Sequence, residues 1–441
     1  MKDLKTAAPE ASASCTENDA REPEYYKTNR LLYIIEAAVE YFIALFVGSA
    51  YLAKLTTSIG MSDGLTGVLS SFISLGFGFQ LLALFLSGKK KIKRTIILMH
   101  LINQLSFSML YLIPVFDIPS GVKTVMFAAF LLMGEVLQNV IYSPKMTWLM
   151  SSVRNNDRGS FTAKKEIVSL ISGVIISFGM GAVIDYFEAA GELNVAFIIG
   201  GITLFALTVI HTALLFGIKE RVEEKEESVS VKLQIKEAVT DKNLMKLIPL
   251  FMLWNIAHYI TTPFYGTYLQ KELAFSMSAI ALLSAVGALA RALCSIPMGK
   301  FADRFSFVNM LTVCYTIVLI GYIFNIFAGG VFYIVYSLCH AIAMAGINSG
   351  TVNLVYDYVG RSKRTGTLAI KNTIAGFTGF FATLAARPLV DYIQGEGNRF
   401  LGIDGVYAQQ VLSSFAAVIV VIIILYLNFV VRKMEKRIDK E

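Results

Sequence analysis

The feature that most constrains this chain is a series of twelve long apolar runs separated by short polar turns. A helix needs about 20 apolar residues to cross the hydrocarbon core of a bilayer, and each run supplies them. The expected membrane helices are residues 30–55, 64–88, 95–115, 122–150, 165–187, 194–217, 244–270, 276–299, 306–328, 331–357, 367–392 and 406–431. With 55% hydrophobic and 16% charged residues, the composition also excludes a soluble enzyme of this length. The sequence therefore predicts an all-α membrane protein with twelve transmembrane helices.

The positions of lysine and arginine predict how the chain sits in the membrane. Of these 39 residues, 32 lie in the tails and loops on the side of the two termini, and 4 lie in the loops on the other side. Because positively charged loops stay in the cytoplasm, we expect a multi-pass protein of the cell membrane with both termini cytoplasmic. The basic face suits anionic lipid, so the bilayer is an expected partner and nucleic acid is not.

A polar stretch at 218–243 divides the chain into two parts. We expect a polar tail at 1–29, a six-helix bundle at 30–217, a charged cytoplasmic linker at 218–243, a second six-helix bundle at 244–431 and a basic tail at 432–441. The halves match each other in order: Gly76 and Gly88 correspond to Gly287 and Gly299, and Asp185-Tyr186 corresponds to Asp391-Tyr392. This order predicts two pseudo-symmetric halves arranged as parallel repeats.

The turn after the run at 276–299 reads Gly299-Lys300-Phe301-Ala302-Asp303-Arg304. We interpret it as a hairpin between membrane helices, with Gly299 allowing the backbone to reverse tightly. Its spacing resembles the cytoplasmic loop motif G-x-L-A-D-R-x-G-R-R of the major facilitator superfamily. Together with the twelve helices and the repeat, it makes nearly the whole chain resemble a bacterial-type member of that family, with no subfamily assigned.

The resemblance implies a role for each helix. The first, fourth, seventh and tenth helices would line a central cavity, the second, fifth, eighth and eleventh would form the contact between halves, and the others would face lipid. It also implies an inner gate at the turn, where Asp303, beside Gly299 and Arg304, would meet Arg361, Arg364 and the start of the eleventh helix, at 367–392. The matching loop after Gly88 is basic and lacks the acid, so we predict a gate that is stronger in the second half.

Ionisable residues in the helices assigned to the cavity are candidate coupling or substrate groups, because a charge in hydrocarbon costs several kcal/mol. They are Glu36, Glu40, Glu135, Lys145, His258 and His340. Glu36 and Glu40 lie one turn apart on one helix face, and two carboxylates so close in low dielectric cannot easily both ionise. One of them is expected to load and release a proton near neutral pH. A static pairing with Lys145 or Arg291 is the alternative.

Other candidates have two interpretations each. Glu135, near the midplane, is either a functional group of the cavity or a partner in a structural ion pair. Lys145 is expected to extend to the cytoplasmic interface. Arg291 either binds an anionic group of a substrate or balances one of the glutamates. Arg387, one turn before Asp391, predicts a local ion pair.

The run at 244–270 presents Asn255, His258, Thr262 and Tyr265 at helical spacing along one face. Their mixture of hydrogen-bonding and aromatic groups suits a polar organic solute, sugars included, although packing alone would produce the same pattern.

The sequence contains no phosphate-binding loop of the form G-x-x-x-x-G-K-S/T, so an ion gradient rather than ATP is the expected energy source. It also shows no nucleophile, metal or cofactor constellation, so we expect no enzyme activity, no cofactor and no metal site. We predict a secondary active transporter that moves a small polar organic solute by alternating access. The expected partners are that solute, protons or another coupling ion, and the bilayer, and the expected state is a monomer.

Two alternatives to this function remain open. The first is proton-driven multidrug efflux, which the many aromatic residues permit. The second, less favoured, is a non-transporting membrane sensor on the same scaffold, since the linker and the C-terminal tail are small for an output domain.

Overall fold

The computed structural model describes residues 24–83, 92–153, 157–220, 235–236, 239–359 and 364–434. Gly88 and Arg361, together with most of both tails and of the linker, lie outside the described residues. In the described part, 11 helices are long and apolar enough to cross a membrane, and a bent pair brings the total to 12. The expected all-α fold with twelve crossings is therefore confirmed.

The first half holds six crossings. Its elements are α1 (Glu24–Phe46), α2 (Ser49–Ser58), α3 (Asp63–Ser70), α4 (Phe72–Gly78), η1 (Gln80–Leu82), α6 (Lys93–Leu112), η2 (Ile113–Val115), α7 (Ser120–Met150), α8 (Arg158–Ala189) and α9 (Leu193–Gly217). Helices α1 and α2 form the bent pair, with 44° between them. The chain breaks at Gly48, whose backbone is extended and therefore ends the helical hydrogen-bond ladder.

The second half repeats this plan. Its elements are α11 (Lys242–Tyr259), η4 (Thr262–Phe264), α12 (Tyr265–Thr267), η5 (Tyr268–Glu272), α13 (Met277–Phe305), α14 (Phe307–Asn325), α15 (Gly330–Tyr358), α16 (Arg364–Gly395), β1 (Arg399–Phe400), β2 (Ile403–Asp404), α17 (Ala408–Phe429) and η7 (Val431–Lys433). The seventh crossing is broken after α11, where Pro263 supplies no backbone N–H and a short 3₁₀ turn begins.

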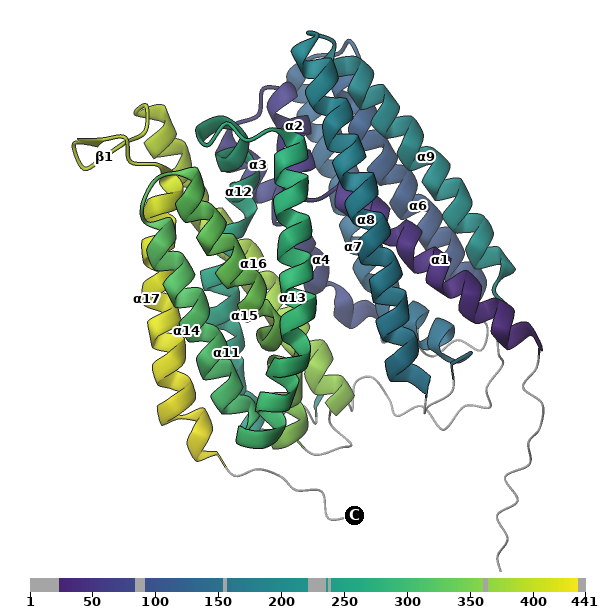
Figure 1. The fold of residues 1–441 in the computed structure, drawn as a ribbon, viewed down its shortest axis with the longest axis vertical. Coiled ribbons are helices and arrows are strands. Elements are labelled where there is room, and N and C mark those ends of the chain that lie inside the picture. The colour runs from purple at the N-terminus through teal and green to yellow at the C-terminus, as the bar shows by residue number, and fades with distance from the viewer. Residues whose placement is uncertain are drawn as a thin grey trace, which may run out of the picture.

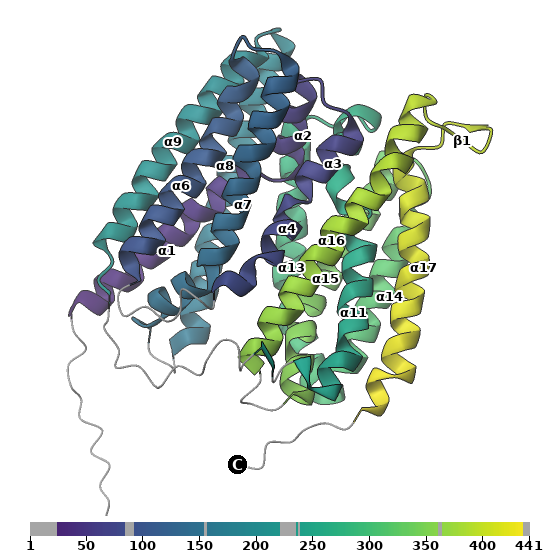
Figure 2. The same ribbon diagram turned by 180° about the vertical axis from the view of Figure 1, so that it is seen from behind.

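The two halves meet through the helices that the family resemblance assigned to this contact. Helices α3 and α4 pack against α16, and α8 packs against α13 (Figures 1 and 2). The approach of α4 to α16 is so close that a Cβ atom built on Gly376 would lie 2.4 Å from the backbone nitrogen of Gly78. A glycine is therefore required at position 376.

The start of α1 and the end of α17 lie at one end of the bundle, which we call the terminal end; we call the opposite end the far end (Figure 1). At the far end, the carboxylate of Asp185 near the end of α8 accepts hydrogen bonds from the backbone nitrogens of Met277 at 2.8 Å and Ser278 at 2.9 Å. Asp391, its counterpart in α16, accepts one from the nitrogen of Gly64 at 3.2 Å. Each half thus caps the start of a helix of the other half.

A third carboxylate adds to this closure. Asp63, the first residue of α3, lies 2.5 Å from the ammonium of Lys271 and accepts a hydrogen bond of 2.5 Å from the side chain of Gln394. Both partners belong to the second half. The far end is therefore held shut by polar contacts that cross between the halves.

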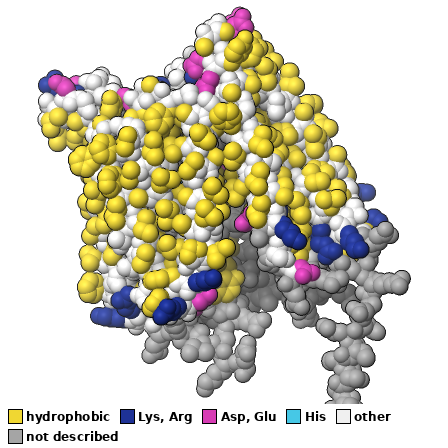
Figure 3. Space-filling model, viewed as in Figure 1, with side chains coloured by type: hydrophobic (Ala, Val, Ile, Leu, Met, Phe, Trp, Pro, Cys, Tyr) yellow, Lys and Arg dark blue, Asp and Glu magenta, His cyan; other side chains and the backbone are white. Residues whose placement is uncertain are grey.

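The outer surface fits a membrane. Hydrophobic side chains cover the middle of the molecule, and charged side chains gather toward its two ends (Figure 3). The surface is notched between the two halves, and the notch opens toward the terminal end (Figure 3).

Two local expectations have opposite outcomes. Arg387 lies 3.2 Å from Asp391, so the expected ion pair one turn apart is confirmed. The tight reversal at Gly299 is wrong, because Gly299 to Arg304 continue α13 as regular helix. The chain turns at Ser306, where φ is 124° and the side chain caps the next helix by accepting from the nitrogen of Asn309. A helix that leaves the bilayer can continue into water because its backbone hydrogen bonds are internal.

Candidate functional site

A cavity of about 580 Å³ lies between the halves on the side of the terminal end. Helices α1, α7 and α8 of the first half and α13 and α15 of the second line it. Its polar lining residues are Tyr33, Glu40, Tyr41, Gln138, Tyr142, Lys145, Lys165, Glu166, Ser169, Arg291, Ser295, Asn348 and Ser349. This size suits a small organic molecule. The lining includes helices from the contact group as well as from the expected cavity group.

A second chamber of about 550 Å³ continues from the first, with Ala44, Gln138 and Tyr142 lining both. Glu135 and His258 line this deeper chamber on opposite halves of the protein. The two chambers together extend from the terminal end toward the middle of the bundle, and polar groups are spaced along a mainly apolar lining.

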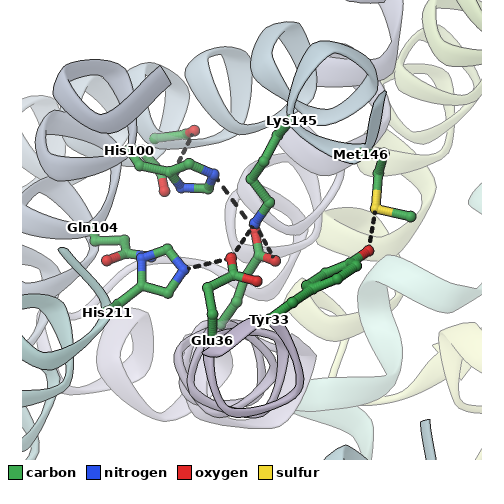
Figure 4. Close-up of polar contacts among 10 residues, drawn as sticks. Tyr33, Glu36, His100, Gln104, Lys145, Met146 and His211 are labelled. Carbon is green, nitrogen blue, oxygen red and sulfur yellow. Dashed lines mark hydrogen bonds and ion pairs between the residues drawn. The ribbon is translucent and has the colours of Figure 1, made fainter. Parts of the chain in front are cut away.

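A buried cluster of charges adjoins the first cavity (Figure 4). The ammonium of Lys145 in α7 lies 2.6 Å from a carboxylate oxygen of Glu36 and 2.6 Å from one of Glu40, both in α1. Lys145 is 2% exposed and Glu36 is fully buried, whereas the side chain of Glu40 is 25% exposed. The expectation that Lys145 extends to the interface is therefore wrong: two carboxylates hold it inside the bundle.

Two histidines from the lipid-side helices extend the cluster. His211 of α9 lies with Nε2 2.8 Å from a carboxylate oxygen of Glu36, and its Nδ1 lies 2.9 Å from the side-chain nitrogen of Gln104 (Figure 4). His100 of α6 lies 3.8 Å from Glu40. Sequence reasoning missed these residues, although a histidine in each of two otherwise apolar helices was the available signal.

The two carboxylates of the cluster have different surroundings: Glu36 is held by buried partners, and Glu40 faces the cavity. Glu36 is held by both Lys145 and His211, so its negative charge is compensated without water. Glu40 shares the same ammonium but lines the cavity. A change of charge on Glu40 therefore alters the partners of a buried lysine.

The cluster also contains a set of atoms of the kind that hold metals. Ligand atoms of Glu36, Glu40 and His211 lie within 4.8 Å of one another. The ammonium of Lys145 already bonds both carboxylates at 2.6 Å, so a positive charge of this chain takes the place that a metal ion would need.

Glu135 has a different environment. It is 8% exposed and lines the deeper chamber with Asn139 and His258. Among the residues that the structure describes, none forms a hydrogen bond or ion pair with its carboxyl group. An ionised carboxylate there has no counter-ion, so its charge depends on water or solute in the chamber.

The expected polar face of the seventh crossing is divided between two places. His258 Nδ1 lies 3.3 Å from Thr262 Oγ1 and 3.3 Å from His340 Nε2, with the two imidazole rings stacked. Asn255 lies on the same helix and lines a side chamber. Tyr265 is 5% exposed and packs against a cluster of tyrosines toward the far end. The structure thus brings His258 and His340 together, and Tyr265 lines a further chamber of about 290 Å³ with Thr262 and His340.

Arg291 of α13 lines the first cavity and forms no ion pair with any described residue. Lys145, not Arg291, balances the two glutamates of α1. At the gate, Asp303 and Arg304 are exposed at the terminal end, and Asp303 pairs with no described side chain. Arg364 begins α16, but its side chain is outside the described part, as is all of Arg361.

Comparison of the sequence with known families gives one match. The family described as Major Facilitator Superfamily matches residues 31–383 and 256–440. A search of curated protein sequences finds no match to this chain.

Solved structures with the same fold are distant in sequence. A mutant of the nucleoside transporter NupG has a TM-score of 0.73 and 13% identity, with 91% of this chain and 99% of that chain covered. A bacterial homologue of the human lysosomal transporter Spinster, in an inward-facing and occupied conformation, has a TM-score of 0.66 and 15% identity, with 93% of this chain and 98% of that chain covered. An auto-inhibited peptide transporter of the POT family has a TM-score of 0.67 and 12% identity, with 94% of this chain and 98% of that chain covered. At such identities the likeness concerns the fold alone.

Proposed function

Because the chain belongs to the major facilitator superfamily, we propose that it is a proton-coupled secondary transporter that moves a small polar organic solute across the cell membrane. The observation that carries this proposal is the central cavity, which opens toward the terminal end and is shut at the far end by contacts between the halves. A cavity closed at one end is one of the two states that alternating access needs.

The proposed orientation follows the distribution of basic residues. With both termini in the cytoplasm, the terminal end is the cytoplasmic side and the structure is open to the inside. The moving bodies are the two six-helix bundles at 30–217 and 244–431, joined by the linker at 218–243. The working unit is a monomer, because each half already supplies one wall of the cavity.

The proton step is assigned to the carboxyl groups of Glu135 and Glu40, and Glu36 is the buried carboxylate that shares Lys145 with Glu40. Glu135 has no counter-ion among the described residues, so closing the chamber around its ionised form is costly. Protonation removes that charge and permits closure. Protonation of Glu40 leaves Lys145 with Glu36 as its one anionic partner, which changes the cavity wall at the same time.

The inner gate completes the cycle. When the cytoplasmic side closes, Asp303 of α13 would reach Arg361, Arg364 and the start of α16, with Gly299 and Arg304 on the same helical segment. This contact belongs to the outward-open state, which agrees with the exposed position of Asp303 in a structure open at that end.

The test begins with a thermal-shift screen of small polar solutes on purified protein, and the strongest ligand is then used in proteoliposomes with a pH gradient. Uptake is expected to follow the gradient, and Glu40→Gln and Glu135→Gln are expected to bind the ligand but lose gradient-driven accumulation. Glu192→Gln, on an exposed residue of the far end, is the matched control. If Glu40→Gln leaves the rate and its pH dependence unchanged, the assignment of Glu40 is wrong. Resistance to hydrophobic dyes in an expressing strain would favour multidrug efflux instead.

A further inference from the structure

A side chamber of about 200 Å³ lies between α11, α15 and α16 of the second half, with Phe77 of α4 as its lining residue from the first half. Its polar lining residues are Asn255, Asn348, Thr351, Lys371 and Asn372, and its aromatic ones are Phe77, Phe251, Trp254 and Tyr259. Asn348 also lines the first cavity, and Tyr259 and Asn372 also line the deeper chamber. The side chamber therefore adjoins both parts of the central cavity.

Lys371 is the charged residue of this chamber. Its ammonium donates a hydrogen bond of 3.3 Å to the hydroxyl of Thr351 and lies 5.1 Å from the ring centroid of Phe251. No carboxylate in the described part of the chain pairs with it. An ammonium has three N–H donors and a full positive charge. One hydroxyl acceptor and one ring face do not neutralise that charge, and the side chain is partly buried.

The contrast with Lys145 makes this arrangement informative. Lys145 is also a lysine inside a membrane helix, but its ammonium is bonded by two carboxylates at 2.6 Å each. The chain thus provides internal anions for one lysine and none for the other. A cation that faces a solute chamber without an internal partner is suited to bind an anion from outside.

The distribution of charge in the three connected chambers supports the same conclusion. Their lining carboxylates, Glu40, Glu135 and Glu166, all come from the first half. The second half contributes the cations Arg291 and Lys371, and neither forms an ion pair with a described residue. The first half also contributes Lys145 and Lys165, so its lining carries charges of both signs, whereas the charged lining of the second half is positive alone. An anionic group is therefore attracted more strongly to the second half than to the first.

We propose that Lys371 and Thr351 form a subsite for an anionic oxygen group of the solute, a carboxylate or a phosphate. The inference rests on the proposed function, since it assumes that the solute occupies the central cavity. The flat rings of Trp254 and Tyr259 would contact the organic part of the solute, and the amides of Asn255 and Asn372 supply further hydrogen-bonding groups.

The test uses Trp254 as a reporter. The chain has two tryptophans, so a Trp148→Phe background leaves Trp254 as the single fluorophore, located in the chamber itself. Purified protein in detergent is titrated with glucuronate, glucose 6-phosphate and glucose, which share one sugar skeleton. We expect at least one of the two anions to change the fluorescence and to bind at least about tenfold more tightly than glucose. The anion that binds better identifies the group as carboxylate or phosphate.

Variants assign the effect to one side chain. Lys371→Gln is expected to weaken the anion about tenfold or more and to leave glucose unchanged, whereas Lys371→Arg retains the preference. Lys371→Met, an apolar replacement of similar length, gives the same answer if the glutamine variant does not fold. Lys300→Gln removes a positive charge from an exposed position on α13 and serves as the matched control.

Three results would overturn the subsite: equal binding of glucose and both anions, no binding of either anion, or unchanged anion affinity in Lys371→Gln and Lys371→Met. These measurements need no gradient, so they are independent of transport. If the bound anion is not moved by a pH gradient in proteoliposomes, the proposed function fails and the subsite stands. If the gradient drives transport of a neutral solute and the lysine variants are unaffected, the proposed function stands and the subsite fails.

Discussion

Replacing Asp185 is expected to loosen the far end of the protein. Its carboxylate accepts two backbone hydrogen bonds, from Met277 at 2.8 Å and Ser278 at 2.9 Å, in the first turn of α13. Asparagine keeps one acceptor oxygen but loses the negative charge that the helix N-terminus favours. A hydrogen bond to a charged group contributes about 1.5–3 kcal/mol, and the charge at the helix start about 0.3–1 kcal/mol.

The residue lies near the molecular surface, so we take about 2 kcal/mol as the loss in Asp185→Asn. That loss changes the ratio of far-end-closed to far-end-open molecules about 30-fold. Asp391→Asn is expected to have a smaller effect, because Asp391 accepts one backbone bond at 3.2 Å and also pairs with Arg387.

The distance between the two halves at the far end is the direct measurement. Spin labels at positions 192 and 396, which are exposed and belong to different halves, are placed in a background without the four native cysteines. The parent should give mainly the short distance of the closed end, and Asp185→Asn and Asp185→Ala should add a longer one. Asp404→Asn, an exposed aspartate in the short hairpin, is the control. An unchanged distance distribution in both Asp185 variants, or an equal change in the control, would refute the reasoning.

Three further changes test other parts of the structure. Lys145→Met leaves two carboxylates without their cation, so it should destabilise the folded protein by roughly 3 kcal/mol or more. The measurement is the unfolding temperature in detergent, which should fall. An unchanged temperature would show that water already reaches the cluster. Gly376→Ala should cost about 1–3 kcal/mol by the same assay, because its Cβ would lie 2.4 Å from a backbone nitrogen, whereas Gly395→Ala, with open space around it, should cost less. Asp303→Asn should lower the share of molecules closed at the terminal end, measured by the accessibility of cysteine probes there; equal accessibility in mutant and parent would contradict the inner gate.

The sequence was sufficient for what depends on length and periodicity. Apolar runs predicted the crossings because a bilayer fixes their length, and the family resemblance predicted which helices meet between the halves. The ion pair of Arg387 with Asp391 was predictable because both lie on one helix, a turn apart.

What required the structure was the meeting of side chains from different helices. Lys145 was expected at the interface because it lies near a helix end, but its partners come from α1, and no spacing rule links 36 to 145. His100 and His211 look like isolated residues in apolar helices until α6 and α9 bring them beside the same carboxylates. The prediction of a reversal at Gly299 was wrong for another reason. The motif specifies residue types but not where the helix ends, and α13 continues to Phe305 before Ser306 turns the chain.

The two ends of the molecule differ in how many acids are available to close them. At the far end, the repeat preserves both copies, and Asp185 and Asp391 each cap a helix of the other half. At the terminal end, Asp303 has no acidic counterpart, because the matching loop after Gly88 is basic. The two caps at the far end, against the single one proposed for Asp303 at the terminal end, favour closure of the far end, and that is the state in which the structure is found. The sequence predicts an asymmetry at the terminal end alone, whereas at the far end the structure shows both copies of the acid in contact with the other half.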